Sequence, residues 1–124
     1  MADCPFCARI TAGQYDAAFY EFGKLTAVRF EPLDPVTPGH QLYVPAGHIT
    51  DAADDPGTAG YVLACAAHDA RDWFRHRAFN LITSVGAEAT QTVFHLHVHV
   101  VPRREDDGLA LPWTGQQREE SRNG

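Results

Sequence analysis

The chain has 124 residues, the length of one domain, and its hydrophobic content of 44% is ordinary for a globular protein. Its formal net charge of −6 argues against a general nucleic-acid-binding protein, which usually presents a basic face, so we expect no nucleic-acid partner. The sequence contains no apolar run long enough for a membrane span. The first residues also lack the basic and apolar regions of a signal peptide, and we therefore expect a cytoplasmic protein without membrane attachment.

Short elements fill the first half of the chain. Residues 3–10 contain a C-x-x-C pair and predict a metal-binding knuckle or a helical turn. Residues 18–21 and 26–30 are rich in β-branched and aromatic side chains and predict two strands around a turn at 22–24. Residues 31–39 hold three prolines and predict a loop, and residues 40–45 predict a third strand.

One helix dominates the second half. An acidic, turn-rich stretch at 51–56 precedes apolar residues that recur at helical spacing from about 58 to 74, with Asp69 interrupting the stripe. Strands are predicted at 79–84 and 93–102, on either side of a loop at 85–92. The fold class is therefore α+β, with an antiparallel sheet of about five strands and one main helix. We expect the domain at residues 1–104 and a tail at 105–124 that frays from residue 116.

Three histidines alternate with apolar residues in the last predicted strand, at His95, His97 and His99. Successive side chains of a strand point to opposite faces, so the three imidazoles share one face at a spacing of about 6.6 Å. That spacing allows neighbouring histidines to contact one phosphate or one metal ion. A neutral imidazole is also a competent nucleophile toward phosphorus at pH 7, with its neighbours available for orientation or proton transfer.

Other polar residues near this row are candidates for the same site. Gln91 and Thr92 directly precede the row and offer an amide and a hydroxyl to a phosphate. His40 begins a predicted strand and is a candidate supporting residue. A C-x-x-C pair by itself is redox-active, metal-binding or accidental. Zinc requires four ligands, and His48 with one histidine of the row would complete the set begun by Cys4 and Cys7.

The segment His95-Leu96-His97-Val98-His99-Val100-Val101 resembles the signature of the histidine triad (HIT) superfamily. The resemblance covers the chain from about residue 4 to residue 113. Further matching segments occur in the same order as in the family: Asp3-Cys4-Pro5-Phe6-Cys7, Pro35-Val36-Thr37-Pro38-Gly39-His40, Leu42-Tyr43-Val44-Pro45 with His48, Gln91-Thr92, and Pro102-Arg103.

The resemblance implies a nucleotide hydrolase or nucleotidyl transferase of the zinc-binding HINT-like branch. Such proteins are usually homodimers joined through helix and strand, and they act on nucleotide phosphoanhydrides or phosphoramidates. The middle histidine forms a covalent nucleotidyl intermediate, which implies that His97 is the nucleophile and that His99 and the Gln91-Thr92 segment contact the phosphate. A structural zinc is implied at Cys4, Cys7, His48 and His95.

Some positions depart from the family pattern and leave base and ribose recognition open. Pro32 stands where many members carry an aspartate for the ribose, and Glu31 or Asp34 is the candidate substitute. Ser84 replaces a common phosphate-contacting asparagine, and Thr90 replaces a common glycine. Trp113 is a candidate to reach the substrate pocket of a partner subunit. The pattern does not separate a preference for dinucleoside polyphosphates from one for phosphoramidates.

Alternative interpretations remain at this point. In one of them, His95, His97 and His99 bind a single catalytic zinc that activates water. In another, the protein is a non-catalytic nucleotide-binding module, which the residues at positions 32 and 84 favour. In a third, the row is only a strand with solvated histidines.

Overall fold

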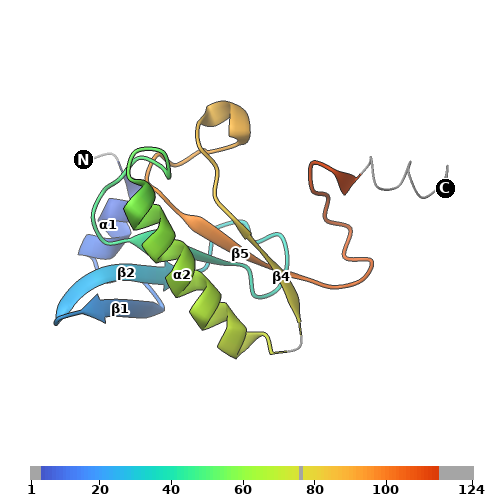
Figure 1. The fold of residues 1–124 in the computed structure, drawn as a ribbon, viewed down its shortest axis with the longest axis horizontal. Helices are drawn as coiled ribbons and strands as arrows, with labels where there is room; N and C mark the ends of the chain where they lie inside the picture. Colours follow the sequence, from blue (N-terminus) through green and yellow to red (C-terminus); the bar gives the residue numbers. More distant parts are fainter. Residues whose placement is uncertain (1–3, 76, 115–124) are drawn as a thin grey trace.

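A computed structural model describes residues 4–75 and 77–114. Its five strands form one antiparallel sheet in the order β1-β2-β3-β5-β4. The long helix α2 crosses one face of this sheet (Figure 1), and the short helix α1 packs against β2 and β3. The predicted α+β class is confirmed. The elements in chain order are α1 Pro5–Thr11, β1 Ala17–Glu21, β2 Lys24–Phe30, β3 Gln41–Pro45, α2 Pro56–Trp73, β4 Ala78–Ile82, the 3₁₀ turn Ala87–Ala89, and β5 Val98–Arg103.

Both helices begin at a capping residue followed by proline. In α1 the Cys4 sulfur accepts a hydrogen bond from the Cys7 N–H at 3.3 Å. In α2 the Asp55 carboxylate accepts from the N–H of Thr58 at 3.1 Å and from its hydroxyl at 2.8 Å. A side chain at this position satisfies N–H groups that the first turn leaves free, and proline fits the first helical position. The helix predicted from about residue 58 therefore starts two residues earlier.

Strand β5 begins at Val98, five residues later than the predicted start at residue 93. The preceding segment bends away from the sheet ladder, because the N–H of Leu96 donates to the Ile49 carbonyl at 2.6 Å. The alternation of side chains nevertheless persists. Leu96 packs with residues of α2, whereas His97 contacts Phe6 of α1 on the opposite side of the sheet.

Two buried clusters lie on the two faces of the sheet. The cluster under α2 contains Tyr43, Val62, Ala66, Ala70, Leu96, Val98 and Val100. The cluster under α1 contains Cys4, Phe6, Val28, Phe30, Leu42 and Val44. The sheet is therefore covered on both faces, and α1 packs directly beside the histidine segment.

Asp69 interrupts the apolar stripe of α2 because it ties the helix to the sheet. Its carboxylate accepts from the Arg29 guanidinium at 2.7 Å and from the Tyr43 hydroxyl at 2.5 Å. The guanidinium of Arg29 also stacks on the Trp73 ring, with 4.1 Å between the guanidinium carbon and the ring centroid. Burial, together with the neighbouring Asp69, raises the pKa of Tyr43 well above its usual range. The break in the stripe is thus a polar contact between α2 and strands β2 and β3.

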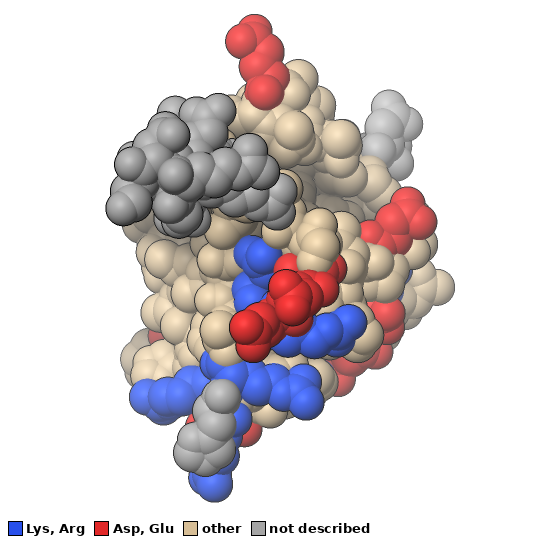
Figure 2. Space-filling model, turned by 90° about the vertical axis from the view of Figure 1, so that its right-hand side faces the viewer, with Lys and Arg blue, Asp and Glu red and all other residues tan. Residues whose placement is uncertain are grey.

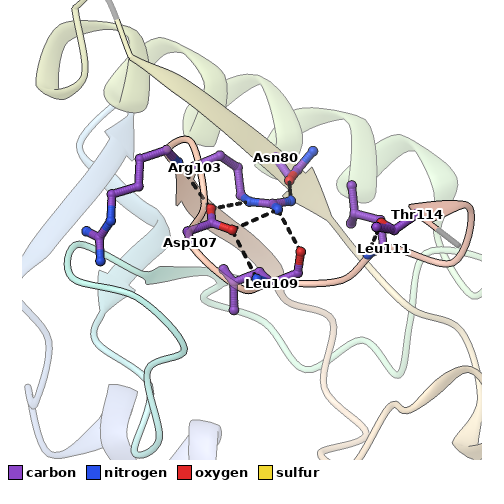
Figure 3. A network of polar contacts seen from close by, with 7 residues as sticks. Asn80, Arg103, Asp107, Leu109, Leu111 and Thr114 are labelled. Atoms are coloured by element: carbon purple, nitrogen blue, oxygen red, sulfur yellow. Dashed lines mark hydrogen bonds and ion pairs between the residues drawn. The ribbon is translucent and has the colours of Figure 1, made fainter. Parts of the chain in front are cut away.

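The segment after β5 is fixed to the sheet by Arg103 (Figure 3). The guanidinium donates to both Asp107 oxygens at 2.8 and 3.2 Å, to the Asn80 side chain at 2.8 Å and to the Leu109 carbonyl at 3.0 Å. On this side of the molecule, acidic side chains lie directly against basic ones (Figure 2). The division into residues 1–104 and 105–124 stays a prediction, and the fraying predicted from residue 116 lies outside the described residues.

Within the described ranges, none of the helices combines the length and the apolar character that crossing a bilayer requires.

Candidate active site and metal site

A pocket of about 210 Å³ opens beside two of the three histidines. Its walls come from the loop before β3, the end of β4, the loop after β4, and β5. The lining residues are Val36, His40, Ile82, Ser84, Thr90, Gln91, His97, His99 and Val101. None of these lining residues carries a permanent charge, so any anion bound here would be held by neutral donors.

Hydrogen bonds fix the protonation pattern of His40 and His99. Nδ1 of the buried His40 accepts the Val36 N–H at 3.1 Å, so the proton of neutral His40 is on Nε2. That Nε2–H donates to Nδ1 of His99 at 2.9 Å. The proton of neutral His99 is therefore on its own Nε2, where it is a donor for a ligand. His40 therefore lies in hydrogen-bond contact with the row, and its role as a supporting residue stays a prediction.

His97 shows the opposite pattern. Its Nδ1 lies 2.8 Å from the His95 carbonyl oxygen, which can only accept, so Nδ1 carries the proton. Nε2 consequently keeps its lone pair, and it makes no hydrogen bond to any described residue. The ring packs edge-on against Phe6 with centroids 5.2 Å apart, and against His99 at 5.0 Å. His97 thus presents an unprotonated nitrogen next to a protonated one on His99.

Burial favours the neutral form of all the imidazoles in the pocket. It lowers the pKa of His40 and of His97 below the ordinary value. It also lowers the pKa of His99 to about 4, and the neighbouring His97 and His40 add to the effect. The arrangement is therefore suited to neutral imidazole chemistry at pH 7.

Four side chains from distant parts of the chain form a second cluster next to this pocket. The ligand atoms of Cys4, Cys7, His48 and His95 all lie within 4.8 Å of one another. Nε2 of the fully buried His95 donates to the Pro45 carbonyl at 3.0 Å. Its Nδ1 lone pair therefore faces the sulfurs of Cys4 and Cys7, at 3.4 and 3.5 Å. Such a cluster can bind a metal ion, and two sulfur and two nitrogen donors are a typical zinc set.

The carbonyl partner of His95 also matches the chemistry of a metal ligand. Metal-bound histidines usually donate their other ring N–H to a carbonyl or carboxylate, which fixes the ring and its tautomer. Pro45 provides this partner at the end of β3. Burial raises the pKa of the Cys7 thiol, with Cys4 adding to the effect, and bound metal would offset this cost by stabilising the thiolate.

The remaining predicted residues lie at different distances from the pocket. Ser84 and Gln91 line it, but the Gln91 amide is engaged with the chain. Its oxygen accepts the Gly86 N–H at 2.8 Å, and its nitrogen donates to the carbonyls of Thr50 at 2.8 Å and Val93 at 3.2 Å. Thr92, Glu31 and Trp113 are exposed and are not among its lining residues. Ligand contacts by all five residues stay predictions.

Sequence reasoning missed several of the pocket walls. Val36, Ile82 and Val101 are apolar positions without any distinguishing pattern in the sequence. Thr90, which in the sequence stands out only as a departure from the family motif, also lines the pocket. The N–H of Val36, which sets the His40 tautomer, is a backbone group, and nothing in the sequence indicates it.

The chain is similar to known proteins of one family. The HIT domain family model matches residues 12–106. An uncharacterised HIT-like protein of Mycobacterium tuberculosis is 36% identical over 116 residues, which cover 87% of this chain and 76% of the relative. A zinc-bound histidine triad protein of Mycobacterium smegmatis superposes with a TM-score of 0.68 at 34% identity, covering 89% and 81% of the two chains. A HIT family hydrolase of Clostridium thermocellum gives 0.72 at 26% identity, covering 90% and 99%.

We predict that His99 stays neutral far into the acidic range. An NMR titration of the imidazoles should place its midpoint near pH 4, against about 6.5 for an unperturbed histidine, because burial penalises the charged ring. An unfolded chain would bind a proton at that position near pH 6.5. The contribution of His99 to the free energy of unfolding should therefore decline as the pH falls from 6.5 toward 4. A His99→Gln variant assigns the signal, and a midpoint near 6.5 would refute the prediction.

Proposed function

Because the chain belongs to the HIT family, we propose that it acts at the α-phosphate of nucleotides as a hydrolase or nucleotidyl transferase. The substrates are nucleoside phosphoramidates or dinucleoside polyphosphates, and the reaction passes through a covalent nucleotidyl-histidine. One observation carries the proposal: the hydrogen bond from Nδ1 of His97 to the His95 carbonyl leaves the Nε2 lone pair of His97 free beside the Nε2–H of His99.

In the first step, Nε2 of His97 attacks the α-phosphorus. A nitrogen–phosphorus bond forms, and the bond from phosphorus to the leaving amine or phosphate breaks. The leaving group departs with that electron pair and takes a proton from water. Nδ1–H remains bonded to the His95 carbonyl, which stabilises the positive charge that the substituted ring acquires.

In the second step, water or another acceptor attacks the same phosphorus. A phosphorus–oxygen bond forms, the nitrogen–phosphorus bond breaks, and the electron pair returns to Nε2 of His97. The attacking water gives up one proton to the solvent, and a nucleoside monophosphate leaves. His97 is regenerated in the tautomer that it started from.

Neutral donors would stabilise the charge that builds on the phosphoryl oxygens. Nε2–H of His99 is one such donor, and the hydroxyl of Ser84 is a second. Phosphate contacts by Gln91 and Thr92 rest on the family resemblance, because the Gln91 amide is engaged with Gly86, Thr50 and Val93 and Thr92 does not line the pocket. Ribose recognition by Glu31 and a contact of Trp113 with a partner subunit rest on the family resemblance alone.

We propose a structural zinc at Cys4, Cys7, His48 and His95. When bound, zinc would supply a closed four-coordinate link between α1 and the segment that carries the histidines. The same arrangement disfavours a catalytic zinc on the histidine row. Both ring nitrogens of His95 already face other groups, and Nδ1 of both His97 and His99 is engaged in a hydrogen bond.

A homodimer joined through β4 is also part of the proposal. At one edge of the sheet, β1 ends in the charged Glu21, and its register with β2 shifts between Phe19 and Tyr20, as at a bulge. At the other edge, β4 is a regular strand without a charged residue. Bulges and charges protect edge strands against pairing, so β4 is the edge suited to a second copy.

The nucleophile is tested by mass spectrometry of protein quenched during turnover of adenosine phosphoramidate. We expect a mass increase of one nucleotidyl group in the wild-type protein. His97→Ala should remove both this adduct and turnover, since no other pocket residue presents an equivalent free nitrogen. His68→Ala is the matched control, because His68 is exposed on α2 and does not line the pocket. Absence of an adduct with undiminished turnover by His97→Ala would contradict the assignment and favour a binding module or metal-activated water.

Elemental analysis tests the zinc site. Protein purified without chelator should contain about one zinc per chain, and His95→Ala should lose both the metal and thermal stability. His97→Ala should retain the metal, because its ring lies outside the ligand cluster. Less than half an equivalent of zinc in the wild-type protein would count against the site.

A further inference from the structure

Three residues other than glycine have a positive φ in the described part of the chain: Phe22 at 52°, Thr90 at 74° and Asp106 at 59°. Phe22 and Gly23 form the two-residue connection between β1 and β2, a type of turn that favours positive φ at both positions. Aspartate tolerates the left-handed region comparatively well. A β-branched residue does not, so Thr90, which ends the 3₁₀ turn in the left-handed conformation, is the outlier among the three.

The loop around Thr90 does not need a threonine side chain. The backbone closes the loop by itself: the N–H of Thr90 donates to Ala87 at 3.0 Å and the N–H of Gln91 donates to Gly86 at 3.1 Å. A glycine at position 90 would keep both bonds without the strain. The Thr90 hydroxyl donates only to the adjacent Ala89 carbonyl, and the side chain is exposed. The fold therefore gains little in return for the strained conformation.

The place of Thr90 in the molecule suggests what the side chain does. It lines the pocket that contains His97, His99 and Ser84. At about 210 Å³ this pocket is smaller than the roughly 300–1,000 Å³ typical of small-molecule sites, so one methyl group takes up an appreciable part of its space. Strained residues cluster at functional sites, and here the strained residue lines the pocket that contains His97 and His99.

We infer that Thr90 is a specificity-determining residue that selects the group leaving the α-phosphorus. Its methyl group limits the space in the pocket that contains the two histidines. The pocket therefore favours a small leaving group, such as the amine of a phosphoramidate, over a second nucleotide. This inference rests on the proposed function, and it goes further by choosing between the two substrate classes.

The experiment compares kcat/KM for adenosine phosphoramidate and for diadenosine tetraphosphate in the wild-type protein and in Thr90→Gly. We expect Thr90→Gly to unfold at a higher denaturant concentration, because the strain is relieved. The preference for the phosphoramidate should fall about tenfold or more, the usual effect of one methyl-sized change in a substrate pocket. Thr90→Ser, which removes the methyl group alone, should reproduce most of the loss of preference.

Asp106→Gly provides the matched control. It relieves a positive φ on an exposed turn outside the pocket, so it should leave the substrate preference unchanged. A Thr90→Gly variant with unchanged preference would overturn the inference, and so would one that is less stable than wild type.

Failure of the proposed function would be visible separately, as absence of turnover of both substrates by the wild-type protein. The dissociation constants of adenosine monophosphate and diadenosine tetraphosphate would then replace kcat/KM as the readout. An unchanged ratio of these constants in Thr90→Gly would again overturn the role of Thr90.

Discussion

The arrangement of the site depends on one hydrogen bond, from Nδ1–H of His97 to the carbonyl oxygen of His95, at 2.8 Å. This bond decides which nitrogen of His97 carries the proton and which one faces a substrate. His95 is itself held on both sides of its ring, by the Pro45 carbonyl and by the cysteine pair of α1. The four candidate metal ligands and the candidate nucleophile are therefore connected, through the backbone of His95 and the ring of Phe6.

Alternation and spacing in the sequence were sufficient to predict the main features. They predicted the α+β class, the course of most strands, the face shared by the histidines, and His40 as their neighbour. The predicted start of β5 at residue 93 was wrong because the Leu96 N–H donates to the Ile49 carbonyl and bends the chain there. No local sequence pattern indicates that distant partner. In the sequence, Asp69 is visible only as an interruption of the apolar stripe of α2. Its contacts with Arg29 of β2 and Tyr43 of β3 could not be predicted, because these partners are distant in the sequence.

The pocket itself was harder to predict than the residues that react in it. Its walls include ordinary apolar residues, and its polarity comes from neutral groups whose proton positions depend on backbone partners. Thr90 illustrates the difficulty most clearly. Threonine favours extended structure, so its left-handed conformation follows only from the closure of the loop at Gly86 and Ala87. Local preference fails here at a candidate functional site, where such conflicts are expected.

The most direct test of the central claim is the tautomeric state of His97 in the zinc-loaded protein at pH 7, measured from its side-chain ¹⁵N chemical shifts. We expect the proton on Nδ1 and an unprotonated Nε2, with the opposite assignment for His99. A His97 ring protonated on Nε2, or on both nitrogens, would leave no lone pair for attack on phosphorus and would contradict the claim.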